Sequence, residues 1–496
     1  MNNHPRFRSA RGTSRSLQIS APRLHCGRQG RTKKAQPLSS SPSQHPRDYR
    51  ETVTQHSTEI PLSRCRSSMA SVKSLVAVVA AVGVALLPAV TAQCADLTPV
   101  SQPQLAPGYS AKLILNQLSQ PRSLEFDSLG NLLIVEQGGT GIRYVKLTDN
   151  GGVNVCVASQ KQLIPNGNLT HGIALSADGK VIYASTPTDV LAYPYDAAAG
   201  TVGQARSIIN DMEQTGYHQT RTLLIPKDKP NVLLVSRGSA PNLDLPTADA
   251  SSGRSQIRAF DLTKLTDGPV PYTSGDVFGW GLRNSVGVGE NPKDGGIWSV
   301  ENSLDDMERS GVDVHNENPG EELNYHGSYR AARNPLKGAN YGYPHCFAVW
   351  ETSTITGVPD VKVGSQVIQG SPSGNITDQY CQTVPIPPRL TFTSHTAPLD
   401  IKFHPNGGSA YISFHGSWNR QPPDGYRLSK IVFGVDGQPA AASTSKTAEA
   451  SVAWNSDNAV CPGSCFRPVG LAWDKEGRLF MVSDSTGELF VLTVPA

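Results

Sequence analysis

The sequence lacks the long apolar runs, nucleotide-binding motifs and helical periodicity that mark several large protein classes. Its longest apolar stretch, Leu75 to Leu87, is shorter than the roughly 20 residues that a membrane-spanning helix needs. There is no P-loop, and the glycine cluster at 138–141 has neither the full dinucleotide fingerprint nor a helical segment after it, so it reads as an ordinary turn. We therefore expect no membrane span, no nucleotide site and no helical fold.

Basic charge is scarce outside the N-terminal part of the chain. Residues 1–92 hold 14 of the 44 Lys and Arg and only 3 of the 41 Asp and Glu, which leaves the other 404 residues with a formal charge of −8. Residues 1–68 also lack apolar clusters, so we expect a disordered basic extension. Our interpretation is that translation begins at Met69. A nucleic-acid-binding arm is the alternative, and the acidic remainder does not favour it.

Residues 69–92 have the pattern of a secretory signal peptide. Lys73 supplies the positive charge, Leu75 to Leu87 the apolar region, and Ala89 to Ala92 the small residues of a cleavage site. We therefore expect a secreted protein whose mature part is a single domain over 93–496.

The cysteines and two sequons agree with an extracellular compartment. Six cysteines follow the signal segment, and an even count in a secreted protein predicts three disulfides. The preferred pairs are Cys461–Cys465 and Cys346–Cys381, which leaves Cys94–Cys156. Metal binding by Cys461 and Cys465 is disfavoured because no other thiol or histidine pair lies near them in the sequence. The sequons begin at Asn168 and Asn375.

One pattern recurs six times: a short apolar strand, a turn rich in Asp, Asn, Pro and Gly, and a second apolar strand. The copies begin at Arg122, His171, Arg221, Arg283, Pro398 and Arg467. Hairpins recurring on this scale are typical of propellers. We predict an all-β fold, a six-bladed β-propeller with a long insertion between the fourth and later blades, in the wide interval 301–397. A seven-bladed ring with a degenerate blade in that interval is the alternative.

Arginine and histidine gather at or just before the starts of these copies. The residues concerned are Arg122, His171, His218 with Arg221, Arg283, His395 and Arg467. The innermost strand of each propeller blade lines the central channel, so these cations are expected to converge on one funnel. Their mutual repulsion is unfavourable unless an anion lies among them, and the guanidinium fork suits carboxylates. The pattern predicts a ligand that carries several carboxylates.

Five short stretches, in order along the chain, resemble the soluble quinoprotein glucose and sorbosone dehydrogenases. They are Gly216-Tyr-His218-Gln219, Gly281-Leu-Arg283-Asn284, Val300 to Asp306, Asn340 to Pro344, and Phe466-Arg467-Pro-Val-Gly. The resemblance covers about 110–495 and is nearest in character to the fungal secreted pyranose dehydrogenases that use pyrroloquinoline quinone (PQQ). It implies PQQ and Ca²⁺ as cofactors, a sugar substrate and an external electron acceptor, such as a haem domain or an oxidative polysaccharide enzyme. A monomer is the default expectation.

The resemblance also implies roles for individual residues. His218 matches the base that takes the proton of the sugar's anomeric hydroxyl while hydride passes to the quinone. Arg283 and Asn284 match residues at the quinone end of the cofactor, and Arg467 matches a partner of its carboxylates. The backbone carbonyls of Asn302 and Ser303 match the calcium site. Asp305 and Asp306 are expected to brace that loop.

Some positions depart from the bacterial relatives. The next arginine follows His218 one residue sooner than in those proteins, so His395 is a second candidate for the base. Where they carry a lysine on the fifth blade, this chain has Ser413-Phe-His415-Gly-Ser-Trp418-Asn419. His415 or Asn419 is expected to replace that lysine, and Trp418 to stack on cofactor or sugar. The cofactor-binding set thus contains Arg122, Arg283, Asn284, His395, His415, Trp418 and Arg467.

Two other functions fit a secreted propeller. One is a calcium-dependent lactonase or esterase, whose axial ring of metal ligands would use Glu136, Asn284, Asn302 and Asp484. The excess of Arg and His at the blade starts disfavours such a ring. The other is a non-enzymatic binding propeller, which leaves the meeting of His218 with several arginines unexplained.

Overall fold

A computed structural model describes residues 94–213 and 216–495 of the chain. The predicted basic extension (1–68) and signal peptide (69–92) lie outside the described residues. Within them the structure is built from strands, and the one α-helix of the described part, α1 (Asp378–Thr383), is only 6 residues long. The described residues contain no helix that is long and apolar enough to cross a membrane.

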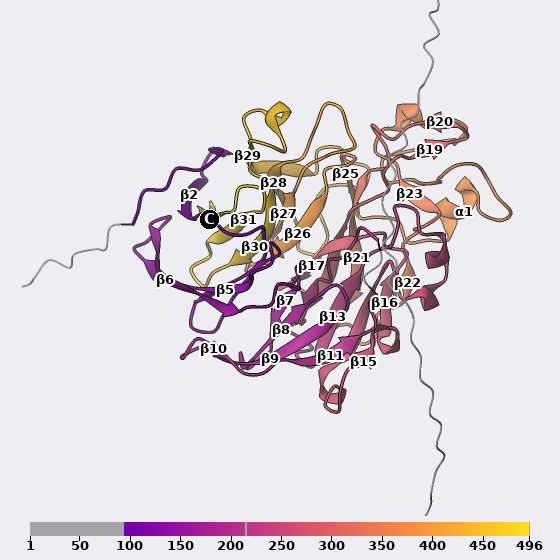
Figure 1. The fold of residues 1–496 in the computed structure, drawn as a ribbon. Coiled ribbons are helices and arrows are strands. Elements are labelled where there is room, and N and C mark those ends of the chain that lie inside the picture. The colour runs from indigo at the N-terminus through magenta and orange to yellow at the C-terminus, as the bar shows by residue number, and fades with distance from the viewer. Residues whose placement is uncertain (1–93, 214–215, 496) are drawn as a thin grey trace, which may run out of the picture. The chain divides into compact units, whose positions relative to one another are not determined.

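Six sheets, each with four antiparallel strands at its centre, form the blades of a propeller, and three of the sheets carry one or two further short strands (Figure 1). Blade one contains β3 (Pro121–Phe126), β4 (Leu132–Glu136), β5 (Gly141–Asp149) and β6 (Val155–Ile164). Blade two contains β7 (Ile173–Leu175), β8 (Val181–Ser185), β9 (Val190–Asp196) and β11 (Arg206–Asn210). Blade three contains β12 (Leu223–Leu224), β13 (Val232–Arg237), β14 (Gln256–Asp261) and β16 (Asp276–Trp280).

The second half of the ring repeats this order. Blade four contains β17 (Ser285–Asn291), β18 (Gly296–Glu301), β21 (Glu321–Ser328) and β25 (Leu390–Phe392). Blade five contains β26 (Pro398–Phe403), β27 (Ser409–Phe414), β28 (Arg427–Val432) and β29 (Glu449–Trp454). Blade six contains β30 (Pro468–Trp473), β31 (Leu479–Ser483), β32 (Glu488–Thr493) and β2 (Ser110–Leu115). The prediction of six blades is confirmed, and each predicted hairpin forms the two inner strands of a blade.

The ring is closed by the N-terminal part of the described chain. Strand β2 pairs antiparallel with β32, with Ser110 opposite Thr493, and becomes the fourth strand of blade six. Its residues Leu113, Ile114 and Leu115 are buried. Closure therefore joins both ends of the propeller sequence in one sheet, which removes an open edge.

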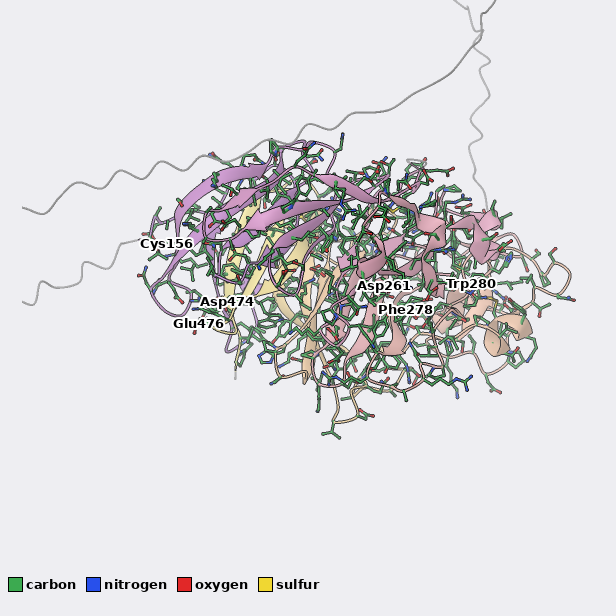
Figure 2. The ribbon with its side chains drawn as sticks, turned by 90° about the horizontal axis from the view of Figure 1, so that it is seen from below. Cys156, Asp261, Phe278, Trp280, Asp474 and Glu476 are labelled. Carbon is green, nitrogen blue, oxygen red and sulfur yellow. A yellow bond between two sulfur atoms is a disulfide. The ribbon has the colours of Figure 1, made fainter. Side chains whose placement is uncertain are left out.

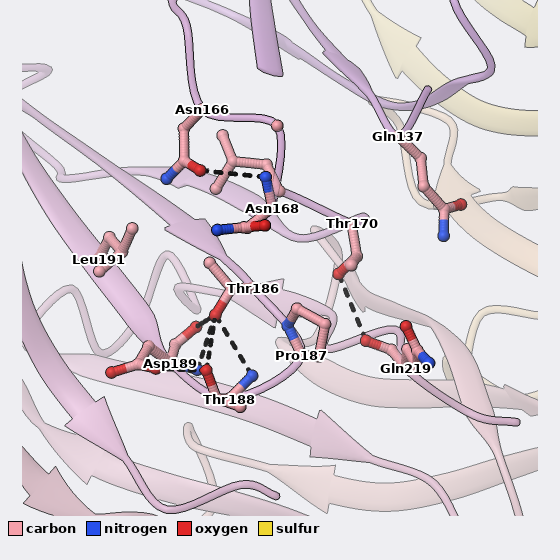
Figure 3. Close-up of a pocket in the computed structure, with 12 residues that line it drawn as sticks. Gln137, Asn166, Asn168, Thr170, Thr186, Pro187, Thr188, Asp189, Leu191 and Gln219 are labelled. Carbon is pink, nitrogen blue, oxygen red and sulfur yellow. Dashed lines mark hydrogen bonds between the residues drawn. The ribbon is translucent and has the colours of Figure 1, made fainter. Parts of the chain in front are cut away.

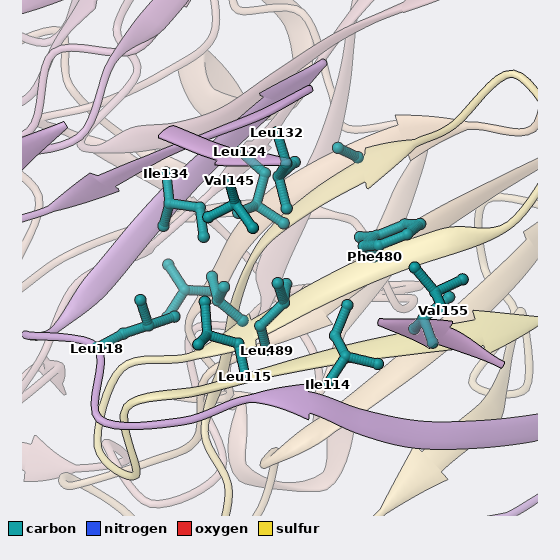
Figure 4. Close-up of a cluster of buried hydrophobic side chains, with 14 of the residues drawn as sticks. Ile114, Leu115, Leu118, Leu124, Leu132, Ile134, Val145, Val155, Phe480 and Leu489 are labelled. Carbon is teal, nitrogen blue, oxygen red and sulfur yellow. The ribbon is translucent and has the colours of Figure 1, made fainter. Parts of the chain in front are cut away.

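Apolar side chains fill the space between neighbouring blades. Leu132, Ile134 and Val145 of blade one are fully buried with Phe480 of blade six (Figure 4). Phe126 meets Phe480 edge to face with ring centroids 5.0 Å apart. Full burial of each such aliphatic side chain contributes about 1.5–3 kcal/mol relative to an exposed one, so inter-blade packing holds the ring rigid around its axis.

Polar turn residues fix each hairpin. In blade one, Asp127 Oδ1 accepts hydrogen bonds from the backbone N–H groups of Leu129 and Asn131. Gly130 then adopts a φ of +79°, which glycine reaches at little cost. At the next blade boundary, Arg478 of blade six binds Asp149 of blade one at 2.6 Å. Figure 2 shows Asp474, the other carboxylate partner of Arg478, on the same side of the propeller as Cys156.

The long insertion interrupts blade four before blade five begins. The interval 301–397 contains β21 and β25 of blade four and, around them, β19 (Glu308–Arg309), β20 (Val312–Asp313), β22 (Ala339–Asn340), β23 (Cys346–Ala348), β24 (Gln366–Ile368) and α1. Strand β22 pairs with β16 of blade three, so the insertion spans two blades. All three predicted disulfides are present: Cys94–Cys156, Cys346–Cys381 and Cys461–Cys465. The second ties β23 of the insertion to α1.

Candidate active site

Seven of the predicted site residues surround one small cavity where the inner strands of blades three to five begin. The cavity has a volume of about 160 Å³ and is lined by His218, Arg283, Asn284, Asn302, Ser303, Asp305, Glu321, His395, Ala397 and Trp418. Of the cations expected to meet in one funnel, His218, Arg283 and His395 line this cavity. Trp418 is 72% exposed, so its ring forms part of the rim and is accessible to a ligand.

His218 is held as a neutral imidazole with one nitrogen free. Its Nδ1 lies 3.0 Å from the carbonyl oxygen of Ser239, which fixes the proton on Nδ1 and leaves the Nε2 lone pair unprotonated. Burial and then the charge of Arg283 lower the pKa of His218 to about 3. No side chain or backbone group of the described residues hydrogen-bonds Nε2. A neutral imidazole with a free lone pair can accept a proton, so His218 has the state that a general base requires.

A glycine lets His218 and Asn284 lie side by side. A Cβ atom on Gly238 would come within 2.5 Å of Asn284 Oδ1 and 2.9 Å of His218 Cβ. Asn284 is buried, its backbone N–H donates to Glu301 at 2.7 Å, and its side-chain amide has no partner among the described residues. Burial raises the pKa of Glu301 to about 8. His218 and Asn284 therefore present one base and one hydrogen-bonding amide to the same cavity.

Arg283 is engaged by the protein more fully than the sequence suggested. Its Nε and Nη2 donate to Asn242, Nη1 donates to the carbonyl of Asn302 at 3.1 Å, and Nη2 also meets Asp305 at 2.9 Å. Four of the five guanidinium N–H groups are thus used, and one on Nη1 is left. Arg283 chiefly clamps the 302–305 loop, and the predicted bracing role of Asp305 is carried out through this ion pair.

His395 is unsuited to be the base. Its Nε2 lies 2.5 Å from the carbonyl oxygen of His315, and its Nδ1 lies 3.6 Å from Asp305. Burial lowers the pKa of His395, but the hydrogen bond to Asp305 and the charge of Glu321 outweigh burial and raise it overall. Because both ring nitrogens have partners, this residue cannot take a substrate proton without breaking a contact.

The loop at Asn302 and Ser303 offers oxygen atoms but no ready-made metal cage. Asn302 Nδ2 donates to the carbonyl of Pro398 at 2.8 Å, so Oδ1 is directed elsewhere and accepts no hydrogen bond within the described residues. Ser303 N–H donates to the buried carboxylate of Glu321 at 2.7 Å. No group of three or more His, Cys, Asp or Glu side chains in residues 94–213 and 216–495 could hold a metal.

Three further predicted residues, Arg122, His415 and Arg467, form a second cluster around Asp484. Arg122 lies 2.9 Å from Asp484 Oδ2, and His415 Nε2 lies 2.9 Å from Oδ1. Arg467 donates to the Nδ1 of His415 at 3.0 Å, so this histidine is neutral with its proton on Nε2. Burial raises the pKa of Asp484, but His415, Arg122 and Arg467 lower it far more. Two arginines face one carboxylate, so the cluster carries excess positive charge.

The Asp484 cluster has donors left for an anion and adjoins the His218 cavity. Nη2 of Arg122 and Nη1 of Arg467 have no hydrogen-bond partner among the described residues. The backbone N–H of His415 donates to the carbonyl of Ala397, which lines the cavity, at 2.9 Å. Trp418 is on the loop that follows His415. The two groups therefore form adjoining parts of one site, the first with a base and the second with unsatisfied cationic donors.

Two other predicted cations do not face the cavity. Arg221 is 1% exposed, and its guanidinium donates to the carbonyls of His218, Thr220, Met212 and Glu213. Burial lowers its pKa to about 9. It therefore holds the loop that carries His218 and was wrongly counted as part of the funnel. His171 is buried and lines a separate cavity along the propeller axis.

Within the described residues, Glu136 and Asp484 do not join Asn284 and Asn302 in the axial ring of calcium ligands expected for a lactonase. Both oxygens of Glu136 accept from Arg143, and Oε1 also accepts from the Ser119 backbone. Asp484 is taken by Arg122 and His415 as described above. Among the described residues, these carboxylates are satisfied by cations and backbone groups.

Comparison with known proteins places the chain. Residues 103–495 match the family described as TrAA12-like. The chain belongs to this family. A pyrroloquinoline quinone-dependent sugar dehydrogenase from Hypocrea jecorina (strain QM6a) is 48% identical to it over 394 residues, covering 79% of this chain and 89% of that protein. A pyrroloquinoline quinone-dependent pyranose dehydrogenase from Coprinopsis cinerea is 38% identical over 411 residues, covering 79% of this chain and 55% of that protein.

Two solved structures of similar proteins have the same fold. The calcium structure of the Trichoderma reesei carbohydrate-active enzyme family AA12 has a TM-score of 0.78 and 47% identity, over 81% of this chain and 99% of that chain. The holo form of the pyranose dehydrogenase PQQ domain from Coprinopsis cinerea has a TM-score of 0.75 and 37% identity, over 80% and 98%. The family resemblance inferred from five short motifs is thereby confirmed.

Proposed function

We propose that this TrAA12-like protein is a PQQ-dependent dehydrogenase that oxidises a pyranose sugar at its anomeric carbon. The observation that carries the proposal is the pairing of a neutral His218, whose Nε2 is free, with an adjoining cationic cluster in which Arg122 Nη2 and Arg467 Nη1 have no partner among the described residues. PQQ is a tricarboxylate ortho-quinone, and its negative charge balances the excess positive charge that Arg122 and Arg467 give to the cluster. Bound in the site, the quinone would supply the acceptor for hydride.

The chain's own residues have separable tasks in this proposal. Arg122, His415 and Arg467 hold carboxylates, and Asp484 keeps the three basic groups in place. Asn284 offers its free amide to the cofactor or the sugar beside His218. Nε2 of His218 accepts the proton of the anomeric hydroxyl, and Ser239 holds the ring so that this lone pair faces the cavity. Trp418 gives an exposed aromatic face for stacking.

Calcium belongs to the proposal through the loop at Asn302. Ca²⁺ prefers carbonyl, amide and carboxylate oxygens, and the Ser303 carbonyl and Asn302 Oδ1 accept no hydrogen bond from the described residues. The Asn302 carbonyl already accepts from Arg283, so a cation there competes with the guanidinium. We propose that the Ser303 carbonyl and Asn302 Oδ1 hold the ion and that the carboxylate of Glu321, which accepts from the Ser303 N–H, balances its charge.

Direct titration tests the function. The protein over 93–496, prepared without cofactor, is titrated with PQQ with and without Ca²⁺, and dye reduction is followed with a panel of pyranoses. We expect saturable, calcium-dependent binding and sugar-driven dye reduction. A failure to bind PQQ in either condition contradicts the proposal, and lactone hydrolysis is then the next activity to assay. Binding without turnover of any sugar would favour a binding propeller.

Several further properties are proposed with the function. The protein is secreted after removal of 69–92, as expected for a chain with three disulfides. Residues 1–68 precede the start of translation, and 93–496 form the functional domain. Electrons leave to an external acceptor, and the protein acts as a monomer. N-terminal sequencing of the protein from its native culture fluid tests the boundaries.

A further inference from the structure

A second, larger cavity lies between blades one and two. Its volume is about 520 Å³, and its walls come from the loops after β4, between β6 and β7, and between β8 and β9, together with Gln219 (Figure 3). These loops are at the end of the blades where the inner strands begin, which is the end that carries His218. A cavity of this size accommodates a ligand of about two sugar rings.

The walls suit a neutral, polyhydroxylated ligand. The side chains of Gln137, Asn168 and Gln219 extend toward the cavity and have no hydrogen-bond partner among the described residues (Figure 3). The lining also includes threonine hydroxyls and the apolar faces of Pro187 and Leu191. Asp189 is its one charged residue, and it is hydrogen-bonded to Thr188 and Ser207. Amides and hydroxyls donate and accept, as sugar hydroxyl and N-acetyl groups require.

One wall of the cavity is itself a glycosylation sequon. Asn168, Leu169 and Thr170 form the sequence Asn-Leu-Thr in the loop between β6 and β7. Asn168 is exposed, whereas Thr170 is buried and its hydroxyl donates to the carbonyl of Gln219 at 3.3 Å. A sugar joined to the Asn168 amide therefore starts inside the cavity.

From this placement we infer that the cavity seats the first sugars of an N-linked glycan on Asn168. The glycan bridges blades one and two through Gln137 and the Thr186–Asp189 loop, and it flanks the approach to His218 through Gln219. The inference rests on the proposed secretion, because the glycan is added only on the secretory route. A free sugar bound in the same cavity is the competing occupant.

The second sequon provides a matched control. Asn375 is exposed in a turn of the insertion, and a Cβ on the adjacent Gly374 would meet no atom within 4 Å. A glycan there projects into open space, so it is expected to change no local exchange rate.

The test uses the full chain secreted from a glycosylating yeast, together with N168Q and N375Q. Peptide masses give occupancy, and amide hydrogen exchange of 186–191 reports seating. We expect exchange on the order of tenfold slower when Asn168 is glycosylated, through reduced local opening. Trimming to a single N-acetylglucosamine keeps part of this protection, N168Q removes it, and N375Q retains it. An unmodified Asn168, or equal exchange in wild type and N168Q, overturns the inference.

Two more measurements identify the occupant. Gln137→Ala is expected to speed exchange of 186–191 in the glycosylated protein but not in the N168Q background, because the Gln137 side chain lines the cavity and bonds no group of the described residues. Chitobiose, the free disaccharide of N-acetylglucosamine, is titrated into N168Q. Saturable binding that restores slow exchange, found together with an unmodified Asn168 in wild type, would show a site for a free sugar and overturn the inference. PQQ-dependent dye reduction on the same samples tests the proposed function separately, because no exchange result depends on it.

Discussion

At the scale of single residues, the two candidate bases are separated by what their ring nitrogens contact. His218 has one free nitrogen, whereas both nitrogens of His395 are engaged. We expect His218→Gln to lower kcat for sugar oxidation by about 10²–10⁴-fold, the usual contribution of a general base, with little change in PQQ affinity. His395→Gln should cost less than about tenfold, through the loosening of Asp305. Steady-state dye reduction and PQQ titration check both, and an equal loss of kcat in the two variants would contradict the assignment.

Asp484 gives the second prediction at this scale. Asp484→Asn leaves Arg122 and Arg467 near each other without their carboxylate, so we expect the cofactor-free protein to lose about 3 kcal/mol of unfolding free energy at pH 7. Because the pKa of Asp484 is depressed, its contribution is present above the ordinary value of 3.8 and declines as pH falls below it. The difference in unfolding free energy between wild type and variant should therefore become smaller below that pH.

Urea unfolding across pH measures the effect of Asp484→Asn. Asp276→Asn is the control, since its ion pair with Lys337 is largely exposed and such pairs contribute about 0–1 kcal/mol. Saturating PQQ should restore much of the lost stability, because its carboxylates take the place of Asp484. A variant as stable as wild type at pH 7 would contradict the expected repulsion between Arg122 and Arg467.

At the scale of elements, the hairpins could be predicted because each carries its own signals. Apolar alternation marks the two inner strands, and residues such as Asp127 and Gly130 mark the turn between them. The direction of the arginine at each strand start could not be predicted in this way. Arg122 belongs to the Asp484 cluster, whereas Arg221 is directed into its own loop. The sequence shows the same residue type at the same position, and only the tertiary partners decide its orientation.

The loop that ends at β12 is predicted to depend on Arg221. Its guanidinium contacts carbonyls on both sides of the loop, at Met212 and at His218, and a lysine cannot span them. We expect Arg221→Lys to lower kcat about tenfold and to speed amide exchange at 216–220. Arg258→Lys is the matched control, because Arg258 also binds backbone carbonyls, at Thr273 and Gly275, but far along the chain from His218. Equal kcat losses in both variants would mean that Arg221 stabilises the fold in general and does not specifically position the loop that carries His218.

At the scale of the whole molecule, the ring followed from the six repeats, but its closure did not. Strand β2 carries no repeat signal of its own, and its partner β32 is nearly 400 residues away in sequence. The wide interval at 301–397 was recognisable as an insertion, whereas its place inside blade four depends on β21 and β25, which resemble no inner hairpin. Long-range pairing of this kind is set by which edge remains unfilled, and a local pattern cannot express it.

Closure by β2 gives the last prediction. Without residues up to 115, β32 becomes an exposed edge and the apolar side chains that packed on Leu113 and Leu115 lose cover, so we expect aggregation or loss of the cooperative thermal transition. Because Thr493 lies opposite Ser110, a short turn after β32 can lead directly into β2. A circular permutant that starts at residue 118 and carries 106–117 after that turn should therefore fold, bind PQQ and unfold within a few degrees of the parent. Cooperative unfolding of the truncated protein without β2 would contradict the role assigned to this strand. The permutant lacks the segment 94–105, which is held by the Cys94–Cys156 disulfide and by the pairing of β1 (Gln104–Leu105) with β29 of blade five. A permutant that does not fold, although the parent does, would show that this segment is needed to complete the ring.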